Sequence, residues 1–188
     1  EGGNALRIRS KGAITLSNIT ATGGGGTGVD LNNVNPSAPQ PVTLNGSTNI
    51  SSFSSYGLKI MSSGVIKANN LSISGNDGGG ALLQNNTLGM GVFLTGENSF
   101  VGSYFGTGLK ILSLGPIAVS NFYAAGNYAD NVVLDNSNGT GGVTALGPGT
   151  VPGVPVAGTV GGAPEAIAVL WTLTAVDAGT GGWGAARP

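Results

Sequence analysis

The chain of 188 residues is long enough for one domain with a buried core, and it contains 36 glycines but no histidine or cysteine, which excludes disulfide frameworks and thiol chemistry. A formal net charge of −1, with only 8% charged residues, argues against nucleic acid as a partner, because phosphate binding needs a basic surface. An apolar content of 40%, with glycines that form no collagen triplet, favours strands and tight turns over a fibrous or disordered chain.

The sequence contains three internal repeats. Their openings are ALRIRSKGAITLSNITATGG from Ala5, GLKIMSSGVIKANNLSISGN from Gly57 and GLKILSLGPIAVSNFYAAGN from Gly108, at offsets of 52 and 51 residues. Each opening is followed by a second, related half: VDLNNVNPSAPQPVTLNG, ALLQNNTLGMGVFLTG and VVLDNSNGTGGVTALG. A repeat therefore holds two segments of about 24 to 28 residues, the length of one β-solenoid coil with three short strands and three turns.

Apolar and polar residues alternate within these segments, as they do in strands that bury one face. The positions predicted to point inward recur at equivalent places in the repeats: Leu6, Leu58 and Leu109; Ile8, Ile60 and Ile111; Ile14, Ile66 and Ile117; Ile19, Leu71 and Phe122; Val29, Ala81 and Val132; Leu31, Leu83 and Leu134; Val42, Val92 and Val143. We expect these residues to stack between coils about 4.8 Å apart. The sequence thus predicts an all-β fold: a right-handed parallel β-helix of about six coils over residues 1–150, followed by a non-repeat C-terminal strand tail over residues 151–188.

Glycine and asparagine recur at the predicted corners. Gly12, Gly64 and Gly115 align, and positive φ angles are cheapest for glycine. Two sets of asparagines align as well: Asn18, Asn70 and Asn121, and separately Asn33, Asn85 and Asn136. We expect these to be buried turn asparagines that bond the backbone of the neighbouring coil.

The stretch GGTGVDLNN, residues 25–33, resembles the calcium-binding nonapeptide G-G-x-G-x-D-x-(large apolar)-x of the repeats-in-toxin family. Calcium in such repeats needs oxygen ligands from consecutive coils. The equivalents of Asp30 in the second and third repeats are Leu82 and Val133, so the aspartate does not recur. The pattern favours a glycine-rich corner that enters a strand, and the sequence predicts no metal site.

Few other residues suggest chemistry. The aspartates form no aligned pair of the kind that polysaccharide-cleaving enzymes use, so we expect no catalytic residues and no cofactor. Arg7, Lys59 and Lys110 align in an outward column at intervals of about 10 Å, roughly one Debye length. This basic column is interpreted either as a weak stripe for an anionic polysaccharide or cell surface, or as solvated positions that discourage lateral aggregation.

The third repeat replaces the charged outer positions Arg9 and Lys11 of the first repeat by Leu112 and Leu114, which predicts an exposed apolar strip. A candidate to cover it lies in the tail, where AIAVLWTLTAVDAG over residues 166–179 is too short to span a membrane and is typical of a long strand. We therefore predict an assembly interface formed by Leu112, Leu114, Ile167, Val169, Trp171 and Leu173.

The repeat pattern over residues 5–147 resembles the extracellular β-helix repeats of bacterial surface proteins of the filamentous-haemagglutinin and adhesin type. The segment GVPVAGTVGGAPEAIAVLWTLTAVDAGTGGWGAARP, residues 153–188, resembles part of a β-rich module of secreted bacterial proteins. Both resemblances imply an extracellular or cell-surface location. They specify the fold more strongly than the function, because such solenoids serve as fibres, adhesins and enzyme scaffolds.

Three functions are compatible with these observations. The leading hypothesis is an extracellular structural protein whose copies associate into a filament, surface fibre or sheath through the solenoid ends and the tail. The alternative is an adhesin stalk or fragment that binds cell surfaces or polysaccharide. An outward row of aromatic residues would support it, but Tyr56, Tyr104, Tyr123 and Tyr128 are scattered in the sequence. A polysaccharide-active enzyme is the least favoured class.

Overall fold

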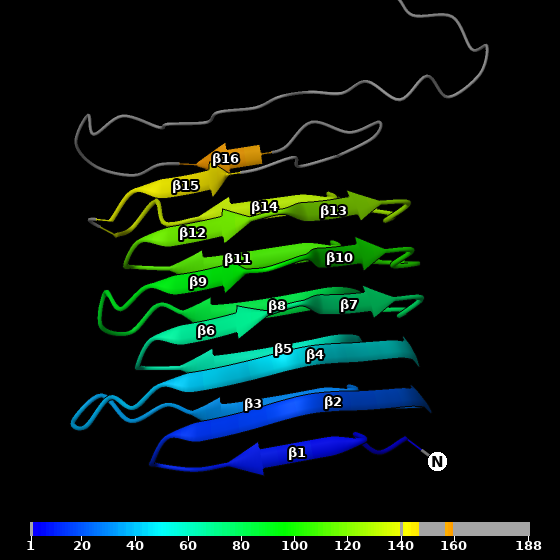
Figure 1. Cartoon of the computed structure of the whole chain (residues 1–188), viewed down its shortest axis with the longest axis horizontal. Coiled ribbons are helices and arrows are strands. Elements are labelled where there is room, and N and C mark those ends of the chain that lie inside the picture. The colour runs from blue at the N-terminus through cyan, green and yellow to red at the C-terminus, as the bar shows by residue number, and fades with distance from the viewer. Residues whose placement is uncertain (1, 140, 147–156, 160–188) are drawn as a thin grey trace, which may run out of the picture.

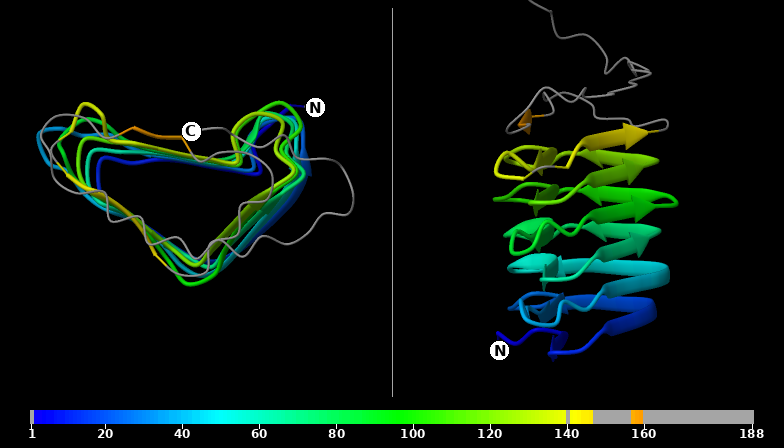
Figure 2. Two further views of the ribbon diagram at one scale, coloured as in Figure 1. Left: turned by 90° about the horizontal axis from the view of Figure 1, so that it is seen from above. Right: turned by 90° about the vertical axis from the view of Figure 1, so that its left-hand side faces the viewer.

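The chain forms a parallel β-solenoid, as the repeats predict. A computed structural model describes residues 2–139, 141–146 and 157–159. These residues contain no helix, and their strands stack in parallel to give about five turns. Figure 1 shows the coils stacked one above another, and Figure 2 shows the three-sided cross-section seen along the stack.

Two sheets carry the strands. The first sheet has the order β1 (Leu6–Arg9), β3 (Val29–Asn33), β5 (Tyr56–Ser62), β8 (Gly79–Asn85), β11 (Leu109–Ser113), β14 (Val132–Asp135) and β16 (Ala157–Thr159). The second sheet bends around a corner and forms the other two sides of the solenoid. It contains β2 (Ile14–Gly24), β4 (Val42–Phe53), β6 (Ile66–Asn69), β7 (Leu71–Ser74), β9 (Val92–Thr95), β10 (Asn98–Val101), β12 (Ile117–Ser120), β13 (Phe122–Ala125) and β15 (Val143–Leu146). Five complete turns are thus followed by β14 and β15 of the sixth predicted coil.

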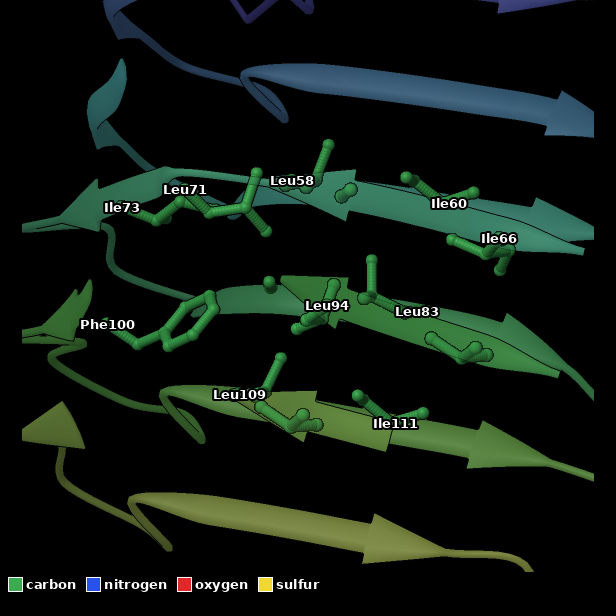
Figure 3. Close-up of a cluster of buried hydrophobic side chains, with 14 of the residues drawn as sticks. Leu58, Ile60, Ile66, Leu71, Ile73, Leu83, Leu94, Phe100, Leu109 and Ile111 are labelled. Atoms are coloured by element: carbon green, nitrogen blue, oxygen red, sulfur yellow. The ribbon is translucent and has the colours of Figure 1, made fainter. Parts of the chain in front are cut away.

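The predicted inward columns form the core. One column pairs in register through six coils: Ile14, Val42, Ile66, Val92, Ile117 and Val143. All six of these side chains are buried. Figure 3 shows buried core side chains of the inner coils, with Ile66 of this column labelled. In one column of the first sheet large and small residues alternate along the stack, as Leu58, Ala81 and Leu109 show. Such alternation is one way in which neighbouring coils differ, and it accords with a sequence that repeats after two coils rather than after one.

A second alternation lies at the corner after the first sheet. Asn33 pairs with Ser62, and Asn85 pairs with Ser113, so asparagine and serine take turns along the stack. The Nδ2 atom of Asn33 donates to the carbonyl of Gln40 at 2.7 Å, and that of Asn85 donates to the carbonyl of Gly64 at 2.7 Å. Asn33, Asn85 and Asn136 are all buried, as predicted for this set. The predicted bond to the neighbouring coil is present for Asn33, to the carbonyl of Gly12, and for Asn85, whereas Asn136 donates to Gly141 of its own coil.

The other asparagine set differs from the prediction. Asn18, Asn70 and Asn121 are exposed rather than buried, with φ angles of 53°, 51° and 45° at the corner between the two sides of the second sheet. Asparagine adopts this left-handed conformation because its short side chain can bond nearby backbone. The Oδ1 atom of Asn70 accepts from the backbone N–H of Glu97 in the next coil at 3.0 Å. Gly96, with φ 70°, occupies this corner in that coil.

The predicted role of the aligned glycines also needs correction. Gly12, Gly64 and Gly115 are not among the described residues with positive φ. Gly64 and Gly115 are required for a different reason, since a Cβ atom at either position would overlap the backbone carbonyl of the neighbouring coil. Close approach of two backbones, and not a left-handed conformation, selects glycine there.

We expect Gly96→Ala to destabilise the solenoid more than Gly75→Ala. Both glycines have positive φ, but a Cβ at Gly75 has no neighbour within 4 Å, whereas one at Gly96 would overlap Asn70 Oδ1. Gly75→Ala should cost the left-handed strain alone, about 1 kcal/mol. Gly96→Ala should cost about 1 kcal/mol more, because the hydrogen bond from Glu97 to Asn70 is also disturbed. Urea unfolding measures both values, and equal losses would show that the contact between coils contributes nothing.

Candidate functional site

Charged side chains gather around Asp30 on β3. The side chain of Asp30 is only 8% exposed. Arg9 binds it with two hydrogen bonds, from Nη2 to Oδ2 at 2.7 Å and from Nη1 to Oδ1 at 3.1 Å. Arg7 Nε lies 3.4 Å from Oδ2, and Asn4 Nδ2 donates to the same oxygen at 3.2 Å. Both carboxylate oxygens are therefore engaged by side chains of the first coil.

The pKa of Asp30 reflects two opposing causes. Burial raises the pKa of this carboxyl, but the hydrogen bond from Arg9 and the positive charges of Arg9, Lys59 and Arg7 lower it, and the net pKa lies below the ordinary value. Asp30 is therefore ionised at neutral pH. Its charge is balanced within the protein and is not available to an external cation.

The register explains why this aspartate does not form a calcium site. Asp30 pairs with Arg7 on one side and with Lys59 on the other, so both vertical neighbours are cationic. A calcium ion needs oxygen ligands from consecutive coils, and here the adjacent coils supply positive charge instead. In the part of the chain that the structure describes, no three or more Asp or Glu side chains cluster as metal ligands would.

The predicted basic column is interrupted. Arg7, Lys59 and Lys110 do lie at every second strand of one outward column, but Asp30 stands between the first two and Leu82 between the last two. Arg7 is engaged by Asp30, which partly neutralises the positive charge at that end. A role of this column in binding an anionic surface stays a prediction.

The predicted assembly interface is described only in part. Leu112 and Leu114 are half-buried rather than fully exposed, and with Asp135 they line a depression of about 100 Å³. Ser63, at the position of the second repeat equivalent to Leu114, is buried and accepts a hydrogen bond from the backbone of Asn35. The turn after β5 breaks the strict alternation there. The tail members of the interface lie outside the described residues: Ile167, Val169, Trp171 and Leu173.

The surface of the first coil that faces away from β3 and β4 is apolar at its centre. We call it the first-coil surface; its side chains are only partly buried against the core, namely Leu6, Ile8, Leu16, Ile19 and Ala21. Their counterparts in the second coil are fully buried where they are apolar, as Leu31 and Leu44 show. The first-coil surface therefore presents the same columns that bury each inner coil, but with one side uncovered by the described residues.

The backbone of β1 also has hydrogen-bonding groups that point away from β3, on the side of the first-coil surface. The N–H groups of Leu6 and Ser10 donate to carbonyls of the second coil at 2.9 Å. Because N–H groups alternate in direction along a parallel strand, those of Arg7 and Arg9 point away from β3. In the described structure β1 pairs with β3 alone.

The sequence pattern did not predict two features on the sides of the solenoid, an aromatic corner and an open groove. Tyr104, Phe105 and Tyr128 are 62%, 75% and 81% exposed at the corner before the first sheet, where the Tyr128 N–H donates to the Ser103 carbonyl and so places two aromatic loops in adjacent coils. An open groove of about 760 Å³ runs along the outer side of β4, β7, β10 and β13. Ser47, Asn49, Asn70, Leu71, Ser72, Glu97, Asn98, Ser99, Asn121, Phe122 and Tyr123 line it.

Comparison of the chain with known protein families, with curated proteins and with solved structures finds no significant match. The fold therefore stands on the structure itself, and the family resemblance stays an expectation from the sequence. In the described ranges there is no helix long and apolar enough to cross a membrane.

The Asp30 cluster generates a prediction on pH. A carboxyl whose pKa is lowered on folding contributes stability above its unfolded pKa, near 4, and that contribution is lost as the pH falls through the folded value. We expect Asp30→Asn to lower the free energy of unfolding by about 1 kcal/mol at neutral pH, a modest value because Arg9 is partly exposed to solvent. At about pH 2 the difference in stability between the variant and the wild type should be smaller than at neutral pH. Urea unfolding at both pH values tests this, and Arg9→Gln should show the same pattern; a loss that persists undiminished at low pH would contradict the ion-pair origin.

The same cluster predicts indifference to calcium. Millimolar calcium or a chelator should leave the melting temperature unchanged, because Asp30 is already neutralised by arginine side chains. Thermal melts followed by circular dichroism provide the measurement. Stabilisation by several degrees on adding calcium would show that an oxygen cluster exists outside the described residues or that the ion pairs open.

Proposed function

We propose that the chain is an extracellular structural protein whose copies associate by stacking coil on coil. The first-coil surface is the observation that carries the proposal. It combines partly buried apolar side chains with backbone groups of β1 that point away from β3. A stacked coil would bury the former and pair with the latter, which is how every inner coil is held.

A second copy of the chain is the proposed occupant of this surface. Each coil of the solenoid contacts its neighbours through the same inward columns, so the upper side of one coil complements the lower side of another. Contact between unlike ends of two copies does not close on itself and therefore gives an open filament rather than a ring. A filament, surface fibre or sheath is the form that such an assembly would take.

The extracellular location and the role of the tail are further parts of this proposal. The location is supported by the low charge content and by the resemblance of the repeats to bacterial surface proteins. Stacking alone is poorly selective, because a sheet edge accepts many strands. We propose that the tail strand with Trp171 supplies the selectivity by packing on Leu112 and Leu114 or on a neighbouring copy.

A proline at the outward N–H of β1 tests the stacking directly. Arg7→Pro removes a donor that points away from β3 and leaves the N–H groups of Leu6 and Ser10 on their carbonyls of the second coil. We expect the wild-type chain to grow in mass with concentration and the variant to stay monomeric, as measured by analytical ultracentrifugation and electron microscopy. Arg7→Ala is the matched control, because it removes the same ion pair with Asp30 without blocking the strand edge.

The outcomes separate clearly. Association of Arg7→Ala like the wild type, together with loss in Arg7→Pro, would support stacking at the first-coil surface. A wild-type chain that remains monomeric at high concentration would refute self-association. Filaments formed equally by Arg7→Pro would move the contact to another part of the molecule.

A further inference from the structure

We propose that the lateral groove along β4, β7, β10 and β13 binds an extended, neutral oligosaccharide. The groove lies on the side of the solenoid, away from the first-coil surface, so this inference goes beyond self-association and does not depend on it. Its lining residues come from four consecutive coils, and the groove therefore runs along the stacking axis. A ligand that follows it must itself be a chain and not a compact small molecule.

The floor of the groove is a regular polar column. Asn49 pairs with Ser72, Ser72 with Ser99, and Ser99 with Tyr123, so one outward side chain from each coil faces the groove. Successive members are about 4.8 Å apart, the spacing of neighbouring strands. This arrangement offers hydroxyl or amide groups at intervals along the groove, and the hydroxyls of a sugar chain can both donate to and accept from such groups.

Tyr123 provides an aromatic surface at one end of this column. Its side chain is 42% exposed on β13, while the preceding Phe122 is buried in the core and fixes the strand beneath it. The C–H face of a pyranose ring is apolar and its rim is polar. Such a ring can lie on an exposed tyrosine ring while its hydroxyls reach Ser99 in the adjacent coil, and the next sugar of the chain can reach Ser72 one coil further along.

The charge of the residues that line the groove indicates the chemical class of the ligand. Among the described residues that line the groove, Glu97 is the only acidic one and none is a lysine or arginine. A polyanion such as an acidic polysaccharide or a nucleic acid would meet a negative charge without a compensating cation. A neutral oligosaccharide meets no such penalty, since its hydrogen bonds to Asn49 and the serines need no counter-charge.

The lining residues favour binding of an oligosaccharide over cleavage of its glycosidic bonds. Hydrolysis of a glycosidic bond ordinarily uses two carboxyl groups that flank the bond, and the described lining residues of the groove supply one. Its volume of about 760 Å³ lies in the range of ligand sites, but it is open along its length. The geometry therefore fits retention of a chain and not its turnover.

Isothermal titration with three hexasaccharides tests the proposal: cellohexaose and maltohexaose as neutral probes, and hexagalacturonate as the acidic probe. We expect at least one neutral probe to bind the 188-residue chain with a Kd of about 1 mM or tighter, and hexagalacturonate to bind at least tenfold more weakly. Tyr123→Ala should weaken the binding of the neutral probe by up to about tenfold, the value of an aromatic contact.

Tyr128→Ala is the matched control. Tyr128 is 81% exposed at a different corner and does not line the groove, so its substitution should leave the affinity unchanged. Unchanged circular dichroism melts would establish that both variants are folded. The proposal is overturned if neither neutral probe binds, if Tyr128→Ala weakens binding as much as Tyr123→Ala, or if hexagalacturonate binds more tightly than the neutral probes.

Discussion

Every residue of this solenoid must fit the residues directly above and below it, at the spacing of neighbouring strands. This constraint acts on side chains that are about 25 residues apart in sequence and in contact in space. It favours pairs of complementary size, as in the column where Ile66 lies between Val42 and Val92. It also acts on the backbone, where Gly64 leaves room for the carbonyl of Gln40. The core, the corners and the charged cluster can each be explained by this vertical fit.

The charged cluster shows how the same constraint governs electrostatics. A lone carboxylate buried in a stack would be costly, because burial penalises its charged form. Asp30 is tolerated since the coils on either side place Arg7 and Lys59 next to it and Arg9 reaches it with two hydrogen bonds. The sequence GGTGVDLNN thus resembles a calcium site, but its aspartate serves an ion pair between coils.

The fold was predictable from the sequence because equivalent residues recur in one column every 51 or 52 residues, as Ile14, Ile66 and Ile117 illustrate. Contacts between the two unlike halves of one repeat were not predictable in this way. The pairing of Asp30 with Arg7 links residues that the repeat alignment never places opposite each other. The groove was missed for a related reason, since its column holds Asn49, Ser72, Ser99 and Tyr123, in which only the two serines share a residue type.

The alternation of unlike coils has a consequence for how such a protein can change its length. Removing one coil would place like beside like, with two asparagines of the Asn33 and Asn85 kind in contact where a serine such as Ser62 now separates them. Removing or duplicating two coils would keep the alternation of asparagine and serine at this corner, although neighbours that differ between coil pairs, such as Asp30 and Leu82, would change. The heritable unit of this architecture is therefore the coil pair, and related chains should differ in length by whole multiples of about 51 residues.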